Sequence, residues 1–183
     1  MSLKLSVIGS GYLGAVHAAC MAELGHEVVA IDTDAAKVEA LAQARPSMYE
    51  PGLAEMLQRV LPTGRLTFTT DYALAADADI HFICVGTPQR KGENAADTSY
   101  VYDSAESLAP YLTRECLVVG KSTVPVGTAF QLRARLQEQS PAGPAVRLAW
   151  NPEFLREGFA IEDTLTPNRF VYGVDGPTAD ADV

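Results

Sequence analysis

A glycine-rich run near the N-terminus has the residue types and the spacing of a phosphate-binding turn. Gly9, Gly11 and Gly14 fit the pattern GxGxxG directly after an apolar run at residues 3–8. In such a turn the first glycine permits the tight bend, the second lets the backbone approach a pyrophosphate, and the third lets the next helix pack closely. Free N–H groups at the helix end then bind phosphate, so the run predicts a dinucleotide site.

An acidic residue follows the next apolar run, about 20 residues further on, where ribose recognition requires one. Asp32 can accept hydrogen bonds from the adenosine ribose there. Asp32 and Asp34 would repel a 2′-phosphate, and no Arg follows directly, so the expected cofactor is NAD rather than NADP. Lys37 could reach the same ribose, although a solvated helix lysine is the more ordinary interpretation.

The fourth apolar run, at residues 80–85, ends in residues that could contact the same ligand. Val85, Gly86, Thr87 and Pro88 end this run, because the glycine and the proline break a strand and Thr87 offers a hydroxyl. A simple turn explains the same residues. Cys84 has no base beside it in the sequence, which favours a structural thiol over a nucleophile.

Two adjacent hydroxyl residues, Ser122 and Thr123, follow the fifth apolar run, at residues 116–119. Hydroxyls at a strand end can bind the nicotinamide ribose or hold a water molecule. A helix cap or a local turn is the competing explanation.

The segment 151–158 follows the last long apolar run and admits two interpretations. Asn151 and Pro152 suit the start of a helix, and Glu153 suits its positive end. Alternatively, Glu153 and Glu157 lie four residues apart on one helix face and could do acid–base chemistry.

The elements that must position these residues alternate along the chain. Apolar runs predict strands, and amphipathic stretches between them predict helices, which together indicate parallel strands with right-handed crossovers. The expected fold is a doubly wound, mostly parallel α/β sheet of the Rossmann type. Strands are predicted at 3–8, 28–31, 66–69, 80–85, 116–119, 146–150 and 170–172, and helices at 12–24, 35–42, 51–60, 98–111 and 129–139.

Composition excludes several classes of protein. The net charge is −9 and no Lys/Arg cluster exists, which argues against nucleic-acid binding. No apolar stretch reaches the ~18 residues of a membrane span, and no signal peptide is evident, so a cytoplasmic location is the default expectation. Cys20, Cys84 and Cys116 are widely spaced, which predicts buried, reduced thiols and no metal site.

Six motifs together resemble the UDP-glucose/GDP-mannose dehydrogenase family over nearly the whole chain. They are GSGYLG at 9–14, AIDTD around Asp32, SMYEPGL at 47–53, VGTP at 85–88, KSTVPVG at 121–127 and NPEFLREG at 151–158. The resemblance implies oxidation of the C6 alcohol of UDP-glucose to UDP-glucuronate with two NAD, through a cysteine-bound intermediate that water hydrolyses. It implies NAD contacts at Gly9, Gly11, Tyr12, Leu13, Gly14, Asp32, Lys37, Val85, Gly86, Thr87, Pro88, Ser122, Thr123 and Glu157.

The same resemblance implies that Glu153, Phe154, Leu155 and Arg156 line the substrate, with Glu153 and Thr123 placing the hydrolytic water. Family members carry a linking helix and a second domain with the nucleophilic cysteine and most uridine contacts. Neither is in residues 1–183, so this chain is expected to be the NAD-binding N-terminal domain and to be inactive alone. The full-length parent is expected to be a homodimer, and the chain itself a monomer.

Three other functions remain open at this point. GDP-mannose 6-dehydrogenase resembles the chain in the same motifs. A 3-hydroxyacid dehydrogenase of the 6-phosphogluconate type shares the first domain but leaves 151–158 unexplained. A non-catalytic NAD-binding module is the third alternative.

Overall fold

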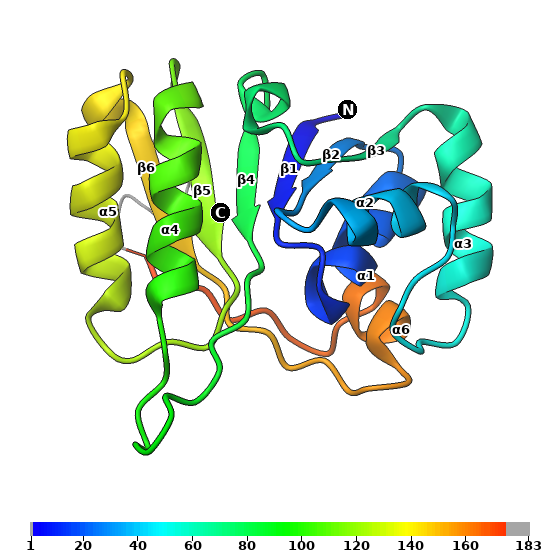
Figure 1. The fold of residues 1–183 in the computed structure, drawn as a ribbon. Helices are drawn as coiled ribbons and strands as arrows, with labels where there is room; N and C mark the ends of the chain where they lie inside the picture. The colour runs from blue at the N-terminus through cyan, green and yellow to red at the C-terminus, as the bar shows by residue number, and fades with distance from the viewer. Residues whose placement is uncertain (1, 175–183) are drawn as a thin grey trace.

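The computed structural model describes residues 2–174, which form a six-stranded sheet in which every neighbouring pair is parallel. The strand order is β3-β2-β1-β4-β5-β6, so the chain changes direction across the sheet between β1 and β4 (Figure 1). This confirms the predicted doubly wound fold. The strands are β1 (Lys4–Ile8), β2 (Glu27–Ile31), β3 (Leu66–Thr69), β4 (Ile80–Ile83), β5 (Cys116–Gly120) and β6 (Val146–Trp150).

Helices cover both faces of the sheet, as the uniformly apolar strands require. They are α1 (Tyr12–Glu23), α2 (Ala35–Ala42), α3 (Leu53–Val60), α4 (Ser99–Leu108), α5 (Thr128–Gln139) and α6 (Ala160–Leu165). Figure 1 shows α4 and α5 side by side over β5 and β6, with α1, α3 and α6 grouped at the other half of the sheet. Each group buries its own hydrophobic core.

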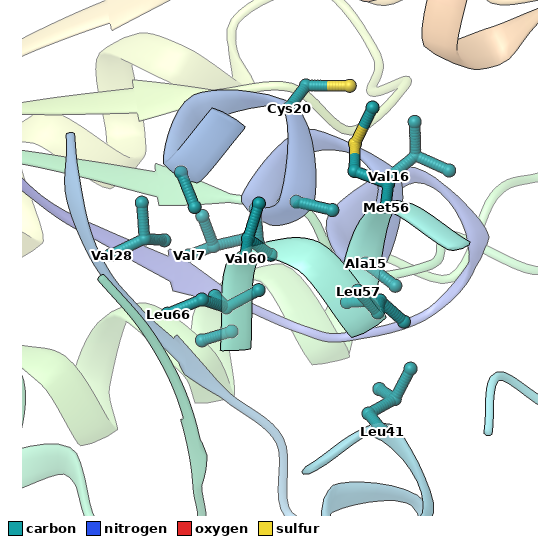
Figure 2. Close-up of a cluster of buried hydrophobic side chains, with 14 of the residues drawn as sticks. Val7, Ala15, Val16, Cys20, Val28, Leu41, Met56, Leu57, Val60 and Leu66 are labelled. Carbon is teal, nitrogen blue, oxygen red and sulfur yellow. The ribbon is translucent and has the colours of Figure 1, made fainter. Parts of the chain in front are cut away.

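The first core forms where α1 packs between the sheet and α3. Small residues line α1, including Ala15, Ala18 and Ala19, all fully buried, so its backbone approaches the strands closely. Leu57 of α3 and Val7 of β1 belong to the same cluster, which Figure 2 shows in close-up. The core therefore fixes α1, and with it the turn that precedes α1.

Most predicted elements are confirmed to within two residues, although α4 ends at Leu108 and the last three residues of the predicted helix, 109–111, form a 3-10 turn. Helix α3 begins at Leu53 rather than at 51, because Gly52 takes a left-handed conformation with φ of 83°. The predicted strand at 170–172 is wrong. The only pairing recorded there among residues 2–174 is a single antiparallel bridge between Gly173 and Trp150.

The three cysteines are free and buried, as predicted. Burial raises the pKa of Cys20 and of Cys84 to about 12, so both thiols stay protonated at neutral pH. Over residues 2–174, no helix is long and apolar enough to cross a membrane. The same residues hold no group of three or more metal-ligating side chains.

Two histidines are buried, one on α1 and one on β4. His17 of α1 packs edge-on against Phe82, with ring centroids 4.4 Å apart, and His81 of β4 makes a 2.8 Å hydrogen bond with Ser6. Burial, aided by the charge of Lys121, lowers the pKa of His17 to about 3. Burial and the positive charge of Arg114 lower the pKa of His81 to about 4. Both rings are neutral in the folded chain near neutral pH.

The free energy of unfolding should therefore fall as the pH drops below about 6.5, where the unfolded chain begins to protonate both histidines and the folded chain does not. Each histidine contributes a slope of up to about 1.4 kcal/mol per pH unit. Urea titrations between pH 6.5 and 5 measure this slope. His17→Leu should reduce it by about one histidine's share, and an unchanged slope would contradict the neutral assignment of His17.

Candidate functional site

The predicted site residues follow the carboxyl ends of five parallel strands, which all meet at one edge of the sheet. The glycine turn follows β1, Asp32 follows β2, and the remaining segments follow β4, β5 and β6. Ligands of open α/β sheets bind beyond this edge, at the point where strand order reverses. In this chain that point lies between β1 and β4.

The glycine turn has the geometry that its spacing predicts. Gly9 has φ of 93°, and its N–H donates to the Ile31 carbonyl at 2.7 Å, which ties the turn to β2. A Cβ on Gly14 would lie 1.8 Å from the Gly9 carbonyl oxygen, so only glycine permits this contact. A Cβ on Gly11 would meet no atom within 4 Å, so open space lies where a pyrophosphate would approach.

Asp32 is nearly buried and its carboxylate is held in place by three donors. Oδ2 accepts from the Ser10 N–H at 2.8 Å and from Lys37 Nζ at 2.9 Å, and Oδ1 accepts from the Asp34 N–H at 3.0 Å. Burial opposes ionisation, but the bonds from Lys37, Asp34 and Ser10 outweigh it and lower the pKa of Asp32. Since a carboxylate has about four acceptor positions, Oδ1 retains one for a ligand hydroxyl.

The interpretation of Lys37 as a solvated lysine is wrong. Its ammonium pairs with Asp32, and only 29% of its side chain is exposed. Asp34 caps α2 by accepting from the N–H groups of Ala36 and Lys37, which places Lys37 one turn into the helix and within reach of β2. Sequence spacing alone does not show this, because the pairing depends on how α2 leaves the strand.

A cavity of about 420 Å³ opens at the junction of β1, β2 and β4. Predicted contacts line it: Gly9, Gly11, Asp32, Lys37, Val85 and Gly86. Cys84 also lines the cavity, but its protonated thiol supports the structural interpretation over a nucleophile. The open space at Gly11 and the anchored carboxylate of Asp32 fit a dinucleotide's pyrophosphate and adenosine ribose.

The hydroxyls after β4 and β5 tie these two loops together. Thr87 Oγ1 donates to the Thr123 carbonyl at 2.8 Å, and Ser122 Oγ donates to the Val85 carbonyl at 2.6 Å. Thr123 and Pro88 are exposed. The backbone between these loops is thus fixed, and the Thr123 side chain remains accessible.

A second cavity, of about 700 Å³, lies on the α1 side of the sheet. The predicted residues Leu13, Glu153, Phe154, Leu155 and Arg156 line it, together with His17, Lys121 and Asn151. The structure thus groups the four predicted substrate residues in one cavity and six of the fourteen predicted cofactor residues in the other. Leu13 belongs to the larger cavity, and Tyr12, at the start of α1, lines neither.

The predicted helix across Glu153 and Glu157 is wrong. Residues 151–159 contain no helix, and α6 begins only at Ala160. Gly158 takes φ of 85°, and Glu153 Oε2 accepts from the Leu155 N–H at 2.7 Å, which holds a local turn instead. The two glutamates therefore do not share a helix face. Glu157 is exposed and lines neither cavity.

Arg156 is held by an acidic partner in α6. The backbone N–H and the guanidinium N–H groups of Arg156 donate to the Asp163 carboxylate at 2.6–3.1 Å. The guanidinium also packs over the ring of Phe159. The hydrogen bonds and charge of Asp163 raise the pKa of Arg156. Arg156 therefore lines the larger cavity with its charge already paired.

Sequence reasoning assigned no role to two buried polar residues at this edge. Lys121 Nζ donates to Asn151 Oδ1 at 2.7 Å, which joins the ends of β5 and β6. Glu50, only 6% exposed, accepts from Tyr12 and from the Gly158 and Ile161 N–H groups. Glu50 sits in the SMYEPGL motif, but its partners lie 38 to 111 residues away, so spacing could not identify them.

Comparison with known proteins identifies the family. The model of the NAD-binding domain of the UDP-glucose/GDP-mannose dehydrogenase family matches residues 3–183. The chain belongs to this family. The matched part is the family's NAD-binding domain. The glycine turn and the two cavities lie at the carboxyl edge of its sheet.

Named relatives agree with the family match. A UDP-glucose 6-dehydrogenase of Rhizobium meliloti (strain 1021) is 46% identical over 95% of the chain, which covers 40% of that relative. A UDP-glucose dehydrogenase structure from Pyrobaculum islandicum is 44% identical, with a TM-score of 0.91 over 100% of this chain and 43% of that one. A GDP-mannose dehydrogenase from Pseudomonas aeruginosa is 35% identical, with a TM-score of 0.89 over 97% of this chain and 42% of that one.

The chain spans about 40% of the length of the curated relatives that it matches. The family match also removes the 3-hydroxyacid dehydrogenase alternative, which left residues 151–158 without explanation.

Two glycine variants should separate packing from ligand approach. Gly14→Ala should destabilise the chain by about 2–3 kcal/mol, because its Cβ would collide with the Gly9 carbonyl. Gly11→Ala should leave stability within about 0.5 kcal/mol but weaken NAD binding at least about tenfold, since its methyl would occupy the open approach. Thermal unfolding and calorimetric titration measure the two effects. Loss of stability in Gly11→Ala would contradict the assignment of Gly11 to ligand approach rather than to packing.

Proposed function

We propose that this chain is the NAD-binding half of a UDP-glucose 6-dehydrogenase, which oxidises UDP-glucose to UDP-glucuronate. The observation that carries the proposal is the anchored Asp32 carboxylate beside the open approach at Gly11, in a chain whose relatives bear that name. The remaining catalytic groups and most of the sugar-nucleotide contacts belong to the part of the protein outside this chain.

The cofactor contacts follow from the geometry of the smaller cavity. Asp32 Oδ1 accepts one hydroxyl of the adenosine ribose, and Lys37 can donate to the other without leaving Asp32. The amide end of α1 receives the pyrophosphate. The loops of Val85–Pro88 and Ser122–Thr123 border the nicotinamide half. NAD supplies a hydride acceptor at this edge, twice per sugar oxidised from alcohol to carboxylate.

The larger cavity supplies the acid–base groups of the proposed reaction. Glu153 lines this cavity close enough to Lys121 to affect its pKa, and Thr123 offers an exposed hydroxyl at the same edge. A carboxylate and a hydroxyl together orient a water molecule for hydrolysis of a thioester. Phe154 and Leu155 give the sugar an apolar wall, and Arg156 borders it.

GDP-mannose oxidation is the second candidate, because the GDP-mannose dehydrogenase from Pseudomonas aeruginosa is 35% identical to the chain and shares its fold. The nucleotide base would be recognised mainly outside this chain, so the candidates are distinguished by turnover of each sugar nucleotide by the full-length parent. UDP-glucose is expected to be the better substrate. Efficient turnover of GDP-mannose alone would overturn the assignment.

The 183-residue chain should bind NAD but produce no NADH from NAD and UDP-glucose. Most of the sugar-nucleotide contacts lie outside the chain, so the alcohol is not held for the first hydride transfer. The three thiols are buried and burial holds the pKa of each above its ordinary value, so the cysteine-bound intermediate of the second oxidation is not formed either. Absorbance at the NADH band measures this directly. Steady NADH production by the chain would show that the chemistry has been placed wrongly.

Asp32→Ala should weaken NAD binding by roughly tenfold or more, and Lys37→Ala by less, because Asp32 orients both the ribose and the lysine itself. Calorimetric titration of NAD into each variant tests the order. Equal losses in the two variants would undercut the ribose assignment. Asp34→Asn is a control for charge, since Asp34 caps α2 rather than facing the ribose.

A further inference from the structure

The segment of residues 151–158, which we call the edge segment, runs along the carboxyl edge of the sheet from β6 to α6. Figure 1 shows it crossing below the strands toward α1, where α6 packs. It carries Glu153 and Glu157, so its course determines where these carboxylates lie relative to the cofactor. A segment without helix or strand needs anchors at both ends to keep such a course.

The anchor at the β6 end is Asn151. Its N–H donates to the Gly120 carbonyl at 2.8 Å, its Oδ1 accepts from Lys121, and its Nδ2 donates to the Val171 carbonyl at 3.0 Å. These bonds fix the start of the edge segment to β5 and to the returning chain.

The anchor at the other end is Glu50. Its Oε2 accepts from the Gly158 N–H at 2.9 Å and from the Tyr12 hydroxyl, and its Oε1 accepts from the Ile161 N–H at 3.3 Å. The Tyr12 hydroxyl also accepts from the Gly158 N–H at 3.1 Å. One buried carboxylate therefore joins the entry of α3, the first residue of α1 and the end of the edge segment.

We propose that Glu50 is a positioning residue that holds the edge segment against the nicotinamide half of the NAD site. The proposal rests on the proposed function. Tyr12 directly follows Gly11, so the hydrogen bonds of Glu50 connect the pyrophosphate-binding turn to the segment that carries Glu153 and Glu157. Asp32, the proposed ribose ligand, accepts from Ser10, Asp34 and Lys37, and among residues 2–174 none of these bonds involves Glu50.

The chemistry of the position requires a carboxylate. Both of its oxygens accept hydrogen bonds, and all of its recorded partners are neutral donors. In Glu50→Gln, the amide NH₂ would face at least one N–H or O–H donor, which breaks that bond and leaves a buried donor without an acceptor. The backbone of Glu50 is itself fixed, since its carbonyl accepts from the N–H of Leu53, the buried first residue of α3.

The test compares NAD with ADP-ribose, which lacks only the nicotinamide, by calorimetric titration into the 183-residue chain. Glu50→Gln should weaken NAD about tenfold and change ADP-ribose less than about twofold. Hydrogen exchange at the Gly158 and Ile161 amides should accelerate in the same variant. Glu55→Gln, at an exposed position of α3, is the matched control and should change neither affinity.

The outcomes separate the two proposals. If the wild-type chain binds ADP-ribose and NAD equally weakly or not at all, the proposed function fails. If wild-type binds NAD and Glu50→Gln weakens both ligands equally, or neither, Glu50 is only a structural residue and this inference is overturned. Tyr12→Phe removes the hydroxyl but keeps the hydrogen bonds from the Gly158 and Ile161 N–H groups to Glu50. It therefore tests the positioning role of Glu50 if Glu50→Gln does not fold. It should weaken NAD selectively, about threefold.

Discussion

The contact between the backbone of Gly9 and the Cα of Gly14 sets the position of everything else at the carboxyl edge. It presses the first turn of α1 against the end of β1, to a distance that no side chain would allow. Small buried residues continue this close approach along α1, and α3 and α6 pack on α1 in turn. The turn before α1 lines the smaller cavity and Leu13 and His17 of α1 line the larger one, so the placement of α1 affects both.

A chain with a net charge of −9 has to attract a pyrophosphate without help from its overall field. The one lysine that lines the smaller cavity, Lys37, is already paired with Asp32. Backbone N–H groups at the start of α1 therefore have to supply most of the attraction, which explains why the turn is built from glycine rather than from basic residues. The Asp32 carboxylate at the same cavity is suited to ribose hydroxyls and would repel a 2′-phosphate by charge.

The sequence determines the parts of this site that depend on local geometry. The glycine spacing, the apolar strands and the acidic residue after β2 each have a local physical cause, and the structure contains all of them. The failures involve tertiary partners. Residues 151–159 look like a capped helix locally, but Gly158 takes a positive φ and donates to Glu50, over a hundred residues away. In the sequence, Lys37 likewise fits a solvated helix lysine, but the position of α2 brings its ammonium to Asp32.

The two cavities differ in the chemical groups that line them, and the acid–base groups lie in the larger one. The larger cavity brings an ammonium, Lys121, near a carboxylate, Glu153. Burial lowers the pKa of Lys121, while the charge of Glu153 opposes that shift. Acid–base groups are thus present on this side of the edge. None of the three thiols is exposed in the described residues, and burial raises the pKa of each. The carboxyl edge of the described residues thus combines a cofactor site with an acid–base pair, but it presents no exposed thiol.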